Sequence, residues 1–329
     1  MWSSAIAWIM TLTLSLLATP LAGEAQPAGT RRIGLLETGS PSPARLQLWE
    51  TLRQRLRELG YVEGQNIAFE SRFGEGQPDQ LPGLVAKLVG LQVDVIVTAG
   101  TPATQAAKQA TRTIPIVMTM VADPVGAGLV ASLGHPGGNV TGLTNQDADL
   151  GGKRLEFLLQ VVPRNSRLAL LIDETNPGTV LIAQGTQTAA RSMGVPLQSL
   201  GVRDPGELER TFAAMKKAQA NALIVEPSSM LFTWRKRLAD LALKNRLPTV
   251  FAHRQYVEAG GLMGYSTDAS DLFRRAATFV DKILKGAKPS ELPVEQPTRY
   301  ELVINLKTAR ALGVTIPQSL LVRADQIIQ

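Results

Sequence analysis

The stretch VDVIVTAGTPATQAAKQATRTIPIV, from Val93 to Val117, contains two apolar strand-like runs separated by a helical segment. The first run ends in Gly100, Thr101 and Pro102, and the helical segment follows at once. Thr101 suits a helix N-cap, and proline suits the first helical position, where its missing N–H group leaves no hydrogen bond unmade. The stretch therefore predicts a strand–helix–strand unit with a junction of small residues.

The same alternation of strand and helix continues along the chain on both sides of this unit. We expect strands at 32–37, 66–73, 93–99, 114–121, 167–173, 196–202, 222–226 and 248–252. We expect helices at 44–59, 81–89, 103–110, 186–193, 207–218 and 234–244. Apolar residues recur at helical spacing in the first of these helices, and Gly60 follows it as a natural stop.

The two halves of this pattern repeat each other. Aligning Ile33 with Leu168 and Val95 with Leu223 gives offsets of 135 and 128 residues. A nearly constant offset indicates two similar units in tandem. Strands that alternate with helices favour parallel sheets covered on both faces. The fold class that we expect is α/β, with two doubly wound parallel-sheet lobes.

Composition narrows the possible classes of protein. The chain has 329 residues, of which 44% are hydrophobic and 19% charged, enough for about two domains. The net charge is +6, but lysines and arginines are interleaved with acidic residues, which favours solvated helix faces over a nucleic-acid surface. Cysteine is absent, so disulfides, thiolate metal sites and thiol nucleophiles are excluded. We expect no nucleic-acid partner.

The first 25 residues have the pattern of a secretory signal peptide. Ala5–Leu17 is mostly apolar, Pro20 interrupts it, and Gly23–Ala25 offers small residues before a cut at Gln26. No lysine or arginine precedes the apolar run, which departs from the usual pattern. The alternative is an uncleaved anchor, but hydroxyl residues dilute the run, which is short for a span of about 20 residues. We expect cleavage after residue 25 and a free periplasmic protein.

Sequence motifs of common catalytic and cofactor sites are missing. There is no phosphate-binding or dinucleotide-binding glycine motif, no G-x-S-x-G and no H-E-x-x-H. The two histidines, His135 and His253, lie far apart. Carboxylates do follow strands, at Glu37, Asp123, Asp173, Glu174 and Glu226, and a pair of them could act as acid and base. Equally, they could cap helices or bind a ligand amine, and we expect no enzyme, cofactor or metal.

Junctions like Gly100–Pro102 follow several other strands. They lie at Thr38–Pro41, Ala122–Pro124, Thr175–Gly178 and Glu226–Ser229. In open parallel sheets, ligands bind beyond the carboxyl ends of the strands, where helix N-termini present amides and partial positive charge. We therefore expect these junctions both to start helices and to line a ligand cleft.

Four long stretches carry a resemblance to a known family. They are ELGYVEGQNI (58–67), VTAGTPATQAAKQATRTIPIVM (97–118), VADPVGAGLVASLGHPGGNVTGLT (121–144) and VDKILKGAKPSELPVEQPTRYELVINLKTARALGVTIPQSLL (280–321). Together they resemble ABC-transporter substrate-binding proteins of the uncharacterised, tryptophan/tyrosine-binding-like family, which have the type I periplasmic binding protein fold. The resemblance implies two lobes joined by a hinge that close around a small solute and deliver it to an ABC permease.

The family pattern also implies domain boundaries, and the strand-end junctions of each lobe supply candidate site residues. Lobe one would take residues 28–143 plus 262–329, and lobe two residues 144–261. The candidate ligand-binding residues are Thr38, Ser40, Gly100, Thr101 and Asp123 in lobe one, and Asn176, Glu226, Ser228, Tyr256 and Tyr265 in lobe two. The helix N-termini would bind a carboxylate and Glu226 or Asp173 an amine, so the solute would be an amino acid or a relative.

Three alternative functions remain open at this point. A ligand-sensing regulator would have the same lobes, but the expected signal peptide stands where its DNA-binding region would lie. An exported protein could pass its signal to a membrane sensor instead of a permease. A secreted enzyme could be built on the same cleft. Because the implied architecture works as a single chain, we expect a monomer.

Overall fold

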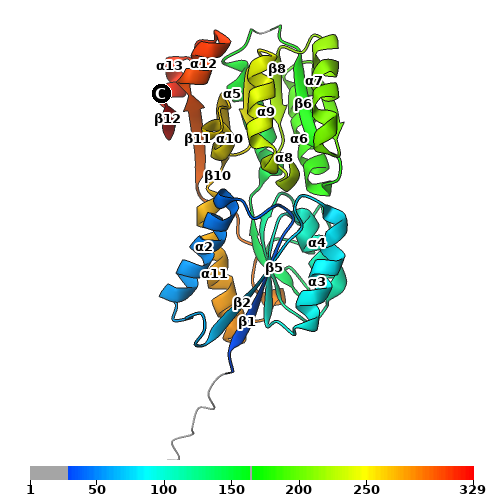
Figure 1. Cartoon of the computed structure of the whole chain (residues 1–329), viewed down its shortest axis with the longest axis vertical. Coiled ribbons are helices and arrows are strands. Elements are labelled where there is room, and N and C mark those ends of the chain that lie inside the picture. Colours follow the sequence, from blue (N-terminus) through cyan, green and yellow to red (C-terminus); the bar gives the residue numbers. More distant parts are fainter. Residues whose placement is uncertain (1–28, 164) are drawn as a thin grey trace, which may run out of the picture.

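Two separate sheets organise the residues that the computed structural model describes, 29–163 and 165–329. The expected signal peptide lies outside these residues. The first sheet has the order β2-β1-β3-β4-β5, and all its neighbouring strands are parallel. Its strands are β1 (Arg31–Glu37), β2 (Ile67–Phe73), β3 (Val95–Ala99), β4 (Ile116–Val121) and β5 (Val140–Thr144). This sheet and the helices on it are lobe one, the lower half of Figure 1.

Helices cover both faces of the first sheet because its strands are apolar on both sides. Helices α2 (Pro43–Glu58) and α11 (Ala269–Leu284) pack on one face, where Trp49 meets Phe273 edge to face at 4.9 Å between ring centres. Helices α3 (Leu81–Gly90) and α4 (Thr101–Ala110) pack on the other. A short 3₁₀ turn, η1 (Pro78–Gln80), leads into α3.

The second sheet has the order β12-β11-β10-β9-β8-β6-β7. Its strands are β6 (Leu168–Asp173), β7 (Leu197–Val202), β8 (Ala222–Val225), β9 (Thr249–Phe251), β10 (Met263–Thr267), β11 (Tyr300–Asn305) and β12 (Gln326–Ile328). All neighbours are parallel except β10 and β11. The expected doubly wound α/β class is therefore confirmed, with one antiparallel pair added.

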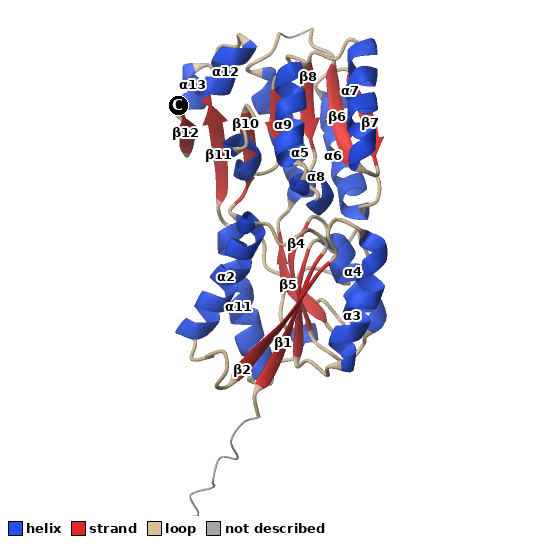
Figure 2. Cartoon of the chain, in the orientation of Figure 1, coloured by secondary structure: helices blue, strands red, loops and turns tan. Residues whose placement is uncertain are grey.

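The helices of lobe two also lie in two layers (Figure 2). One layer holds α5 (Asp147–Leu159), α6 (Pro177–Ser192), α12 (Leu306–Leu312) and α13 (Gln318–Leu321). The other holds α7 (Leu208–Lys217), α8 (Ser229–Thr233), α9 (Arg235–Lys244) and α10 (Arg254–Glu258), with η2 (Pro205–Glu207) before α7. Helix α6 is longer than the expected 186–193, and the expected helix 234–244 is preceded by the separate short helix α8, with Trp234 between α8 and α9.

The division of the chain between the lobes differs from the expected one. The chain crosses between the sheets three times, after β5, after β10 and before β11. Only α11, η3 (Pro289–Glu291) and the segment around Glu295, which pairs with Leu143, return to lobe one. The assignment of 262–329 to lobe one is wrong for 262–267 and 298–329, because β10 pairs with β9 and β11 pairs with β10 in the second sheet. The last helices accordingly join lobe two.

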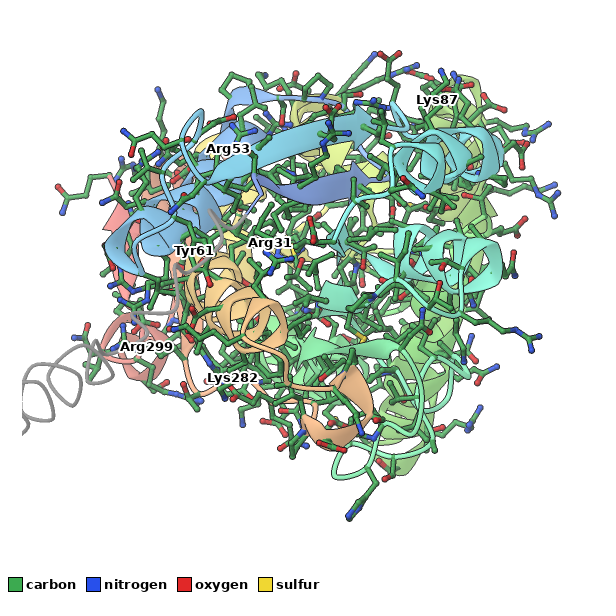
Figure 3. The ribbon with its side chains drawn as sticks, turned by 90° about the horizontal axis from the view of Figure 1, so that it is seen from below. Arg31, Arg53, Tyr61, Lys87, Lys282 and Arg299 are labelled. Atoms are coloured by element: carbon green, nitrogen blue, oxygen red, sulfur yellow. The ribbon has the colours of Figure 1, made fainter. Side chains whose placement is uncertain are left out.

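A partly buried hydrogen bond joins α11 to lobe one. The Tyr61 hydroxyl donates to Asp281 Oδ1 at 3.0 Å. Burial, and then the neighbouring Asp281 carboxylate, raises the pKa of Tyr61 to about 12. Figure 3, seen from the lobe-one end, shows Tyr61 beside α11. This contact joins two segments 220 residues apart in the sequence, so α11 belongs to lobe one although strands of lobe two flank it.

Basic residues of this end come from several elements. Figure 3 labels Arg31 on β1, Arg53 on α2, Lys87 on α3 and Lys282 on α11, and they lie apart from one another. Within the described ranges, no helix combines the length and apolar character that a membrane span requires.

Candidate ligand-binding site

A cavity of about 30 Å³ lies between the lobes, where carboxyl ends of strands from both sheets meet. Lobe one contributes Arg45, Gly100 and Thr101, and lobe two contributes Asp147, Asn176 and Ser228. A cavity needs about 10–15 Å³ of such volume to hold one water molecule. In this arrangement the cavity has room for about two water molecules, so a solute of amino-acid size fits only when the lobes lie further apart.

The lobes touch beside this cavity. A Cβ atom built on Gly178 would lie 2.6 Å from Thr101 Oγ1 across the interface, so glycine is needed for this approach. On the lobe-one side, Gly100 has a φ of 91°, which favours glycine as well. Ser229 Oγ lies within hydrogen-bonding distance, 3.2 Å, of Glu37 Oε1 in the other lobe. These contacts describe a closed arrangement.

Two helix N-termini face each other across the closed interface. Helix α4 begins at Thr101 and α6 at Pro177, and Thr101 lies against Gly178 in the first turn of α6. The amides of a first helical turn have no partner inside the helix, and each N-terminus carries about half a positive charge. In α6 these amides are already used, because Pro177 has no N–H and the amides of Gly178 and the next two residues donate to Asn176. An anion is therefore favoured by the two like dipole ends that meet here and not by free amides of α6. This part of the cavity suits a carboxylate.

A fully buried network of charges lies behind the lobe-two wall. Arg154 Nη2 pairs with Asp147 Oδ1, and Arg154 Nη1 lies 3.2 Å from Glu226 Oε2. Arg154 Nε donates to the Tyr265 carbonyl at 2.9 Å. The Thr186 hydroxyl donates to Glu226 Oε1 at 2.6 Å. Both Glu226 oxygens are therefore occupied within the protein.

Titratable groups around the cavity are shifted by burial. Burial raises the pKa of Asp147 and of Glu226, and the neighbouring Arg154 charge opposes both shifts. Burial, helped by the charges of Arg45 and Arg154, lowers the pKa of His253 to about 3. His253 lines the cavity, so at neutral pH it presents a neutral imidazole. Asp147 is the carboxylate of the cavity wall, and like Glu226 it is fully buried, with Oδ1 paired with Arg154 and Oδ2 accepting from the Asn145 side-chain amide.

The structure brings four of the sequence-predicted residues together. Gly100, Thr101, Asn176 and Ser228 all line the cavity. Asn176 and Ser228 are also N-caps, since Asn176 Oδ1 accepts from the Gly178 amide at 3.0 Å and Ser228 Oγ from the Leu231 amide at 2.9 Å. The junctions thus start helices and face the cleft together. Whether they bind a ligand stays a prediction.

The strand-end candidates Thr38, Ser40 and Asp123 do not line this cavity. Thr38 is buried, and its carbonyl accepts from the Gly76 amide at 2.7 Å. Asp123 Oδ1 accepts from the Gly126 amide at 2.8 Å and so closes a local turn. The Ser40 carbonyl likewise accepts from a backbone amide two residues further on. Their contacts hold the loops above lobe one.

The remaining lobe-two candidates, Glu226, Tyr256 and Tyr265, also lie outside the cavity lining. Tyr256 is buried and stacks on Phe251 at 4.9 Å between ring centres. Tyr265 meets Phe157 edge to face, also at 4.9 Å. In this closed arrangement, Tyr256 packs in the interior of lobe two, whereas Tyr265 is partly buried and also stacks on the exposed Tyr300.

Two charged residues of the cavity lining, Asp147 and Arg45, were not among the sequence candidates. Asp147 begins α5 three residues after the end of β5, as the other junction residues follow their strands. That position could have identified Asp147 as a cleft residue. Arg45 lies in the first turn of α2, just after the junction Thr38–Pro41, but charged residues occur all along this helix. Only the structure separates Arg45 from its exposed neighbours.

Comparison with known proteins agrees with this architecture. The family model of ABC transporter substrate binding proteins matches residues 41–328. The chain belongs to this family. Its members are solute-binding proteins that are usually extracellular or periplasmic. The resemblance inferred from the sequence motifs is thereby confirmed.

Individual relatives share about a quarter of their residues with this chain. A tyrosine-binding protein from Clostridioides difficile (strain R20291) is 26% identical over 259 residues, 79% of this chain and 74% of the relative. The structure of an ABC domain in complex with L-Trp from Streptococcus pneumoniae has a TM-score of 0.85 and 27% identity. It covers 91% of this chain and 100% of that one.

A second solved structure is as similar to this chain as the first, and a third has a lower TM-score. A conserved domain protein from Vibrio cholerae also has a TM-score of 0.85 and 27% identity, over 91% of this chain and 99% of that one. A ligand-free, open structure of a substrate binding protein from Clostridium difficile has a TM-score of 0.64 and 22% identity, over 91% and 100%. It shares the fold.

Proposed function

We propose that this chain is the periplasmic solute-binding component of an ABC importer and that its solute is a small amino acid or a related carboxylate. The observation that carries the proposal is the meeting of two helix N-termini with the Asp147 carboxylate in one inter-lobe cavity. The expected signal peptide and the family support export and a permease partner. The chain has no catalytic role in this proposal, requires no cofactor and works as a monomer.

The cavity offers complementary groups for the two ends of an amino acid. The N-termini of α4 and α6, with Thr101, Asn176 and Ser228, receive the α-carboxylate. We place the α-ammonium group at Asp147 Oδ2, where it would replace the Asn145 side-chain amide that now donates to this oxygen, while Oδ1 stays paired with Arg154. The named ligands of the relatives, tyrosine and L-Trp, are amino acids too. The α-amino-acid group is the part that all these solutes would share.

Closure couples this recognition to transport. In the open state, water fills the cleft; a solute that bridges strand-end loops of both lobes shifts the population toward the closed state. A permease that recognises the closed pair of lobes then receives only loaded protein. Gly178 and Thr101, which touch across the interface, lie where this closure is completed.

Binding assays on the mature chain, residues 26–329, test the proposal. We expect at least one of the twenty L-amino acids at millimolar concentration to raise the unfolding midpoint and to give a calorimetric binding curve. The corresponding decarboxylated amine and the deaminated acid should each bind at least ten-fold more weakly. If no amino acid binds, or the amine alone binds as well, the proposed function is wrong.

A pair of matched variants assigns the amine site. Asp147→Asn keeps the shape and the acceptor oxygen for Arg154 but removes the charge, and we expect a ten-fold or greater loss of affinity. Asp123→Asn changes another strand-end carboxylate, one that closes a local turn outside the cavity lining, and should leave affinity unchanged. Equal affinities of the two variants would contradict the role of Asp147.

A further inference from the structure

Arg45 is a buried cation in the wall of the cavity. It lies in the first turn of α2 in lobe one and is 4% exposed. Its guanidinium group lies 4.4 Å from the ring centre of Phe232, which belongs to α8 in lobe two. Arg45 therefore lines the cavity and at the same time contacts the opposite lobe.

The hydrogen-bonding capacity of this guanidinium is largely unused. Among the described residues, its hydrogen bonding is limited to one contact from Nη1 to Met120 Sδ at 3.3 Å, and a thioether is a weak acceptor. Its Nε is buried and has no partner among them. Glu37 Oε2 balances the charge but lies 3.8 Å from Nη1 and is itself without a hydrogen bond.

Such an arrangement is unfavourable unless another acceptor completes it. A guanidinium carries five N–H donors, and leaving buried donors without partners destabilises a protein. The neighbouring imidazole of His253 is neutral, with a pKa lowered by burial to about 3, so it adds no competing charge. The cavity side of Arg45 is where an acceptor from a solute would fit.

We infer that Arg45 donates to an oxygen in the side chain of the bound solute. Arg45 thereby selects small amino acids whose side chains end in a carboxylate or a carboxamide. This inference rests on the proposed function, which already places the α-carboxylate at the α4 and α6 N-termini and the α-ammonium group at Asp147. Because Glu37 balances the charge of Arg45, both a charged and a neutral oxygen are compatible with the site.

The lining of the cavity argues against an aromatic side chain in the same place. None of the described residues that line it is phenylalanine, tyrosine or tryptophan. Phe232, behind this lining, is buried, and the guanidinium groups of Arg45 and Arg235 lie 4.4 Å and 4.8 Å from its ring centre. This chain therefore selects a more polar solute than the L-Trp named for the Streptococcus pneumoniae structure.

Calorimetry with a panel of four solutes tests the selection in the full mature chain. We expect L-asparagine or L-aspartate to bind at least ten-fold more tightly than L-alanine or L-tryptophan, since a hydrogen bond to a charged group is worth about 1.5–3 kcal/mol. L-Glutamine and L-glutamate extend the panel by one methylene. Comparing asparagine with aspartate, and glutamine with glutamate, shows whether the site prefers a carboxamide or a carboxylate oxygen.

Three variants then assign the selection to Arg45. Arg45→Met removes the donors but keeps an unbranched side chain on Phe232, and should lower the affinity for the preferred solute at least ten-fold without changing that for L-alanine. Arg45→Lys keeps the charge, loses the forked geometry and should give an intermediate value. Arg235→Met is the matched control, since Arg235 stacks on the same ring and does not line the cavity. Its affinities should equal those of the wild type.

The possible outcomes separate the inference from the proposed function. Tightest binding of L-tryptophan, with Arg45→Met unchanged, would overturn the inference and leave an amino-acid-binding protein. An equal loss for every solute in Arg45→Met, L-alanine included, would place Arg45 at the shared α-carboxylate and also overturn it. Absence of binding for all amino acids would contradict the proposed function itself. The unfolding midpoints of Arg45→Met and Arg45→Lys without solute show that both variants are folded.

Discussion

Two buried arginines near the cleft, Arg154 and Arg45, have opposite surroundings. Arg154 uses three of its nitrogens within the protein, on Asp147, Glu226 and the Tyr265 carbonyl. Arg45 has one weak hydrogen bond to sulfur and a carboxylate 3.8 Å away. Both side chains are almost fully buried, so their exposure does not distinguish them.

The difference separates a structural role from a binding role. A buried charge with all its partners holds a fold in one arrangement, and removing one partner leaves an uncompensated charge. A buried guanidinium that has a nearby carboxylate but few hydrogen bonds can be completed by an acceptor that enters the cavity. We therefore expect substitutions around Arg154 to change the free energy of unfolding and substitutions around Arg45 to change the affinity for the solute.

The largest expected effect is on the stability of lobe two. Arg154→Met would leave the Asp147 and Glu226 carboxylates buried without their cation, and we expect a loss of about 3–5 kcal/mol in the free energy of unfolding. Urea unfolding followed by circular dichroism measures it, with Arg235→Met as the control that should change little. A loss below about 1 kcal/mol would show that the two arginines do not differ as described.

Glu226→Gln tests the same comparison beside Arg154, where both Glu226 oxygens already have partners. The sequence suggested Glu226 as a partner for a ligand amine, whereas both its oxygens are occupied by Arg154 and Thr186. We expect a loss of about 1–3 kcal/mol in the free energy of unfolding and a solute affinity within two-fold of the wild type. Full stability combined with strongly reduced affinity would return Glu226 to the binding site.

Gly178→Ala tests whether the interface must close for binding. The new methyl group would lie 2.6 Å from Thr101 Oγ1, closer than real contacts allow. We expect about ten-fold weaker solute binding, or about 1.4 kcal/mol. The double variant with Thr101→Ala removes that oxygen but also a group placed at the α-carboxylate, so we expect it to recover the closure seen by small-angle scattering without recovering full affinity. Gly83→Ala, on α3 with nothing within 4 Å of its added Cβ, is the matched control. Identical affinities in all three variants would mean that the contact is not part of the bound state.

Glu301 on β11 is a partly buried charged group, and its pairing is intermediate between that of Arg154 and that of Arg45. Its partner Arg254 is 3.7 Å away, and burial, followed by the repulsion of Asp268, Asp325 and Glu258, outweighs this cation and raises the pKa of Glu301 to about 7. The folded state therefore binds the proton more tightly than the unfolded state. Stability should fall as the pH rises from about 4.5 to about 7.

The size of this pH effect is modest because Glu301 is partly exposed. We expect on the order of 1 kcal/mol from this group, after allowing for solvent screening. Glu301→Gln should remove this slope between pH 4.5 and 7 in urea unfolding curves, while Glu291→Gln, which changes an exposed carboxylate on η3, should keep it. An unchanged slope in Glu301→Gln would contradict the shifted pKa.

The sequence was sufficient for the features that depend on neighbouring residues. Strand and helix alternation follows from local apolar patterns, and carboxyl ends of parallel strands gather at one edge. This is why Gly100, Thr101, Asn176 and Ser228 could be predicted to meet. Each of these residues also starts or precedes a helix, a role that the residue type itself indicates.

The features that were missed depend on contacts between distant segments. Pairing of β10 with β11 is antiparallel and encloses all of α11, so the local pattern could not say which sheet these strands join. Arg154 and Glu226 are 72 residues apart, and nothing in the sequence indicates that their side chains pair. Arg45 differs from the exposed arginines of α2 only in its burial between the lobes.

Small-angle X-ray scattering of the mature chain tests the central claim, that the lobes close on a small polar amino acid. On titration with the tightest-binding amino acid of the panel, the profile should shift toward a more compact particle, somewhat wider than the closed structure because the solute needs more room than the present cavity of about 30 Å³. The change should be reduced in Gly178→Ala. A profile that stays the same while calorimetry shows saturation would contradict closure as the response to the solute.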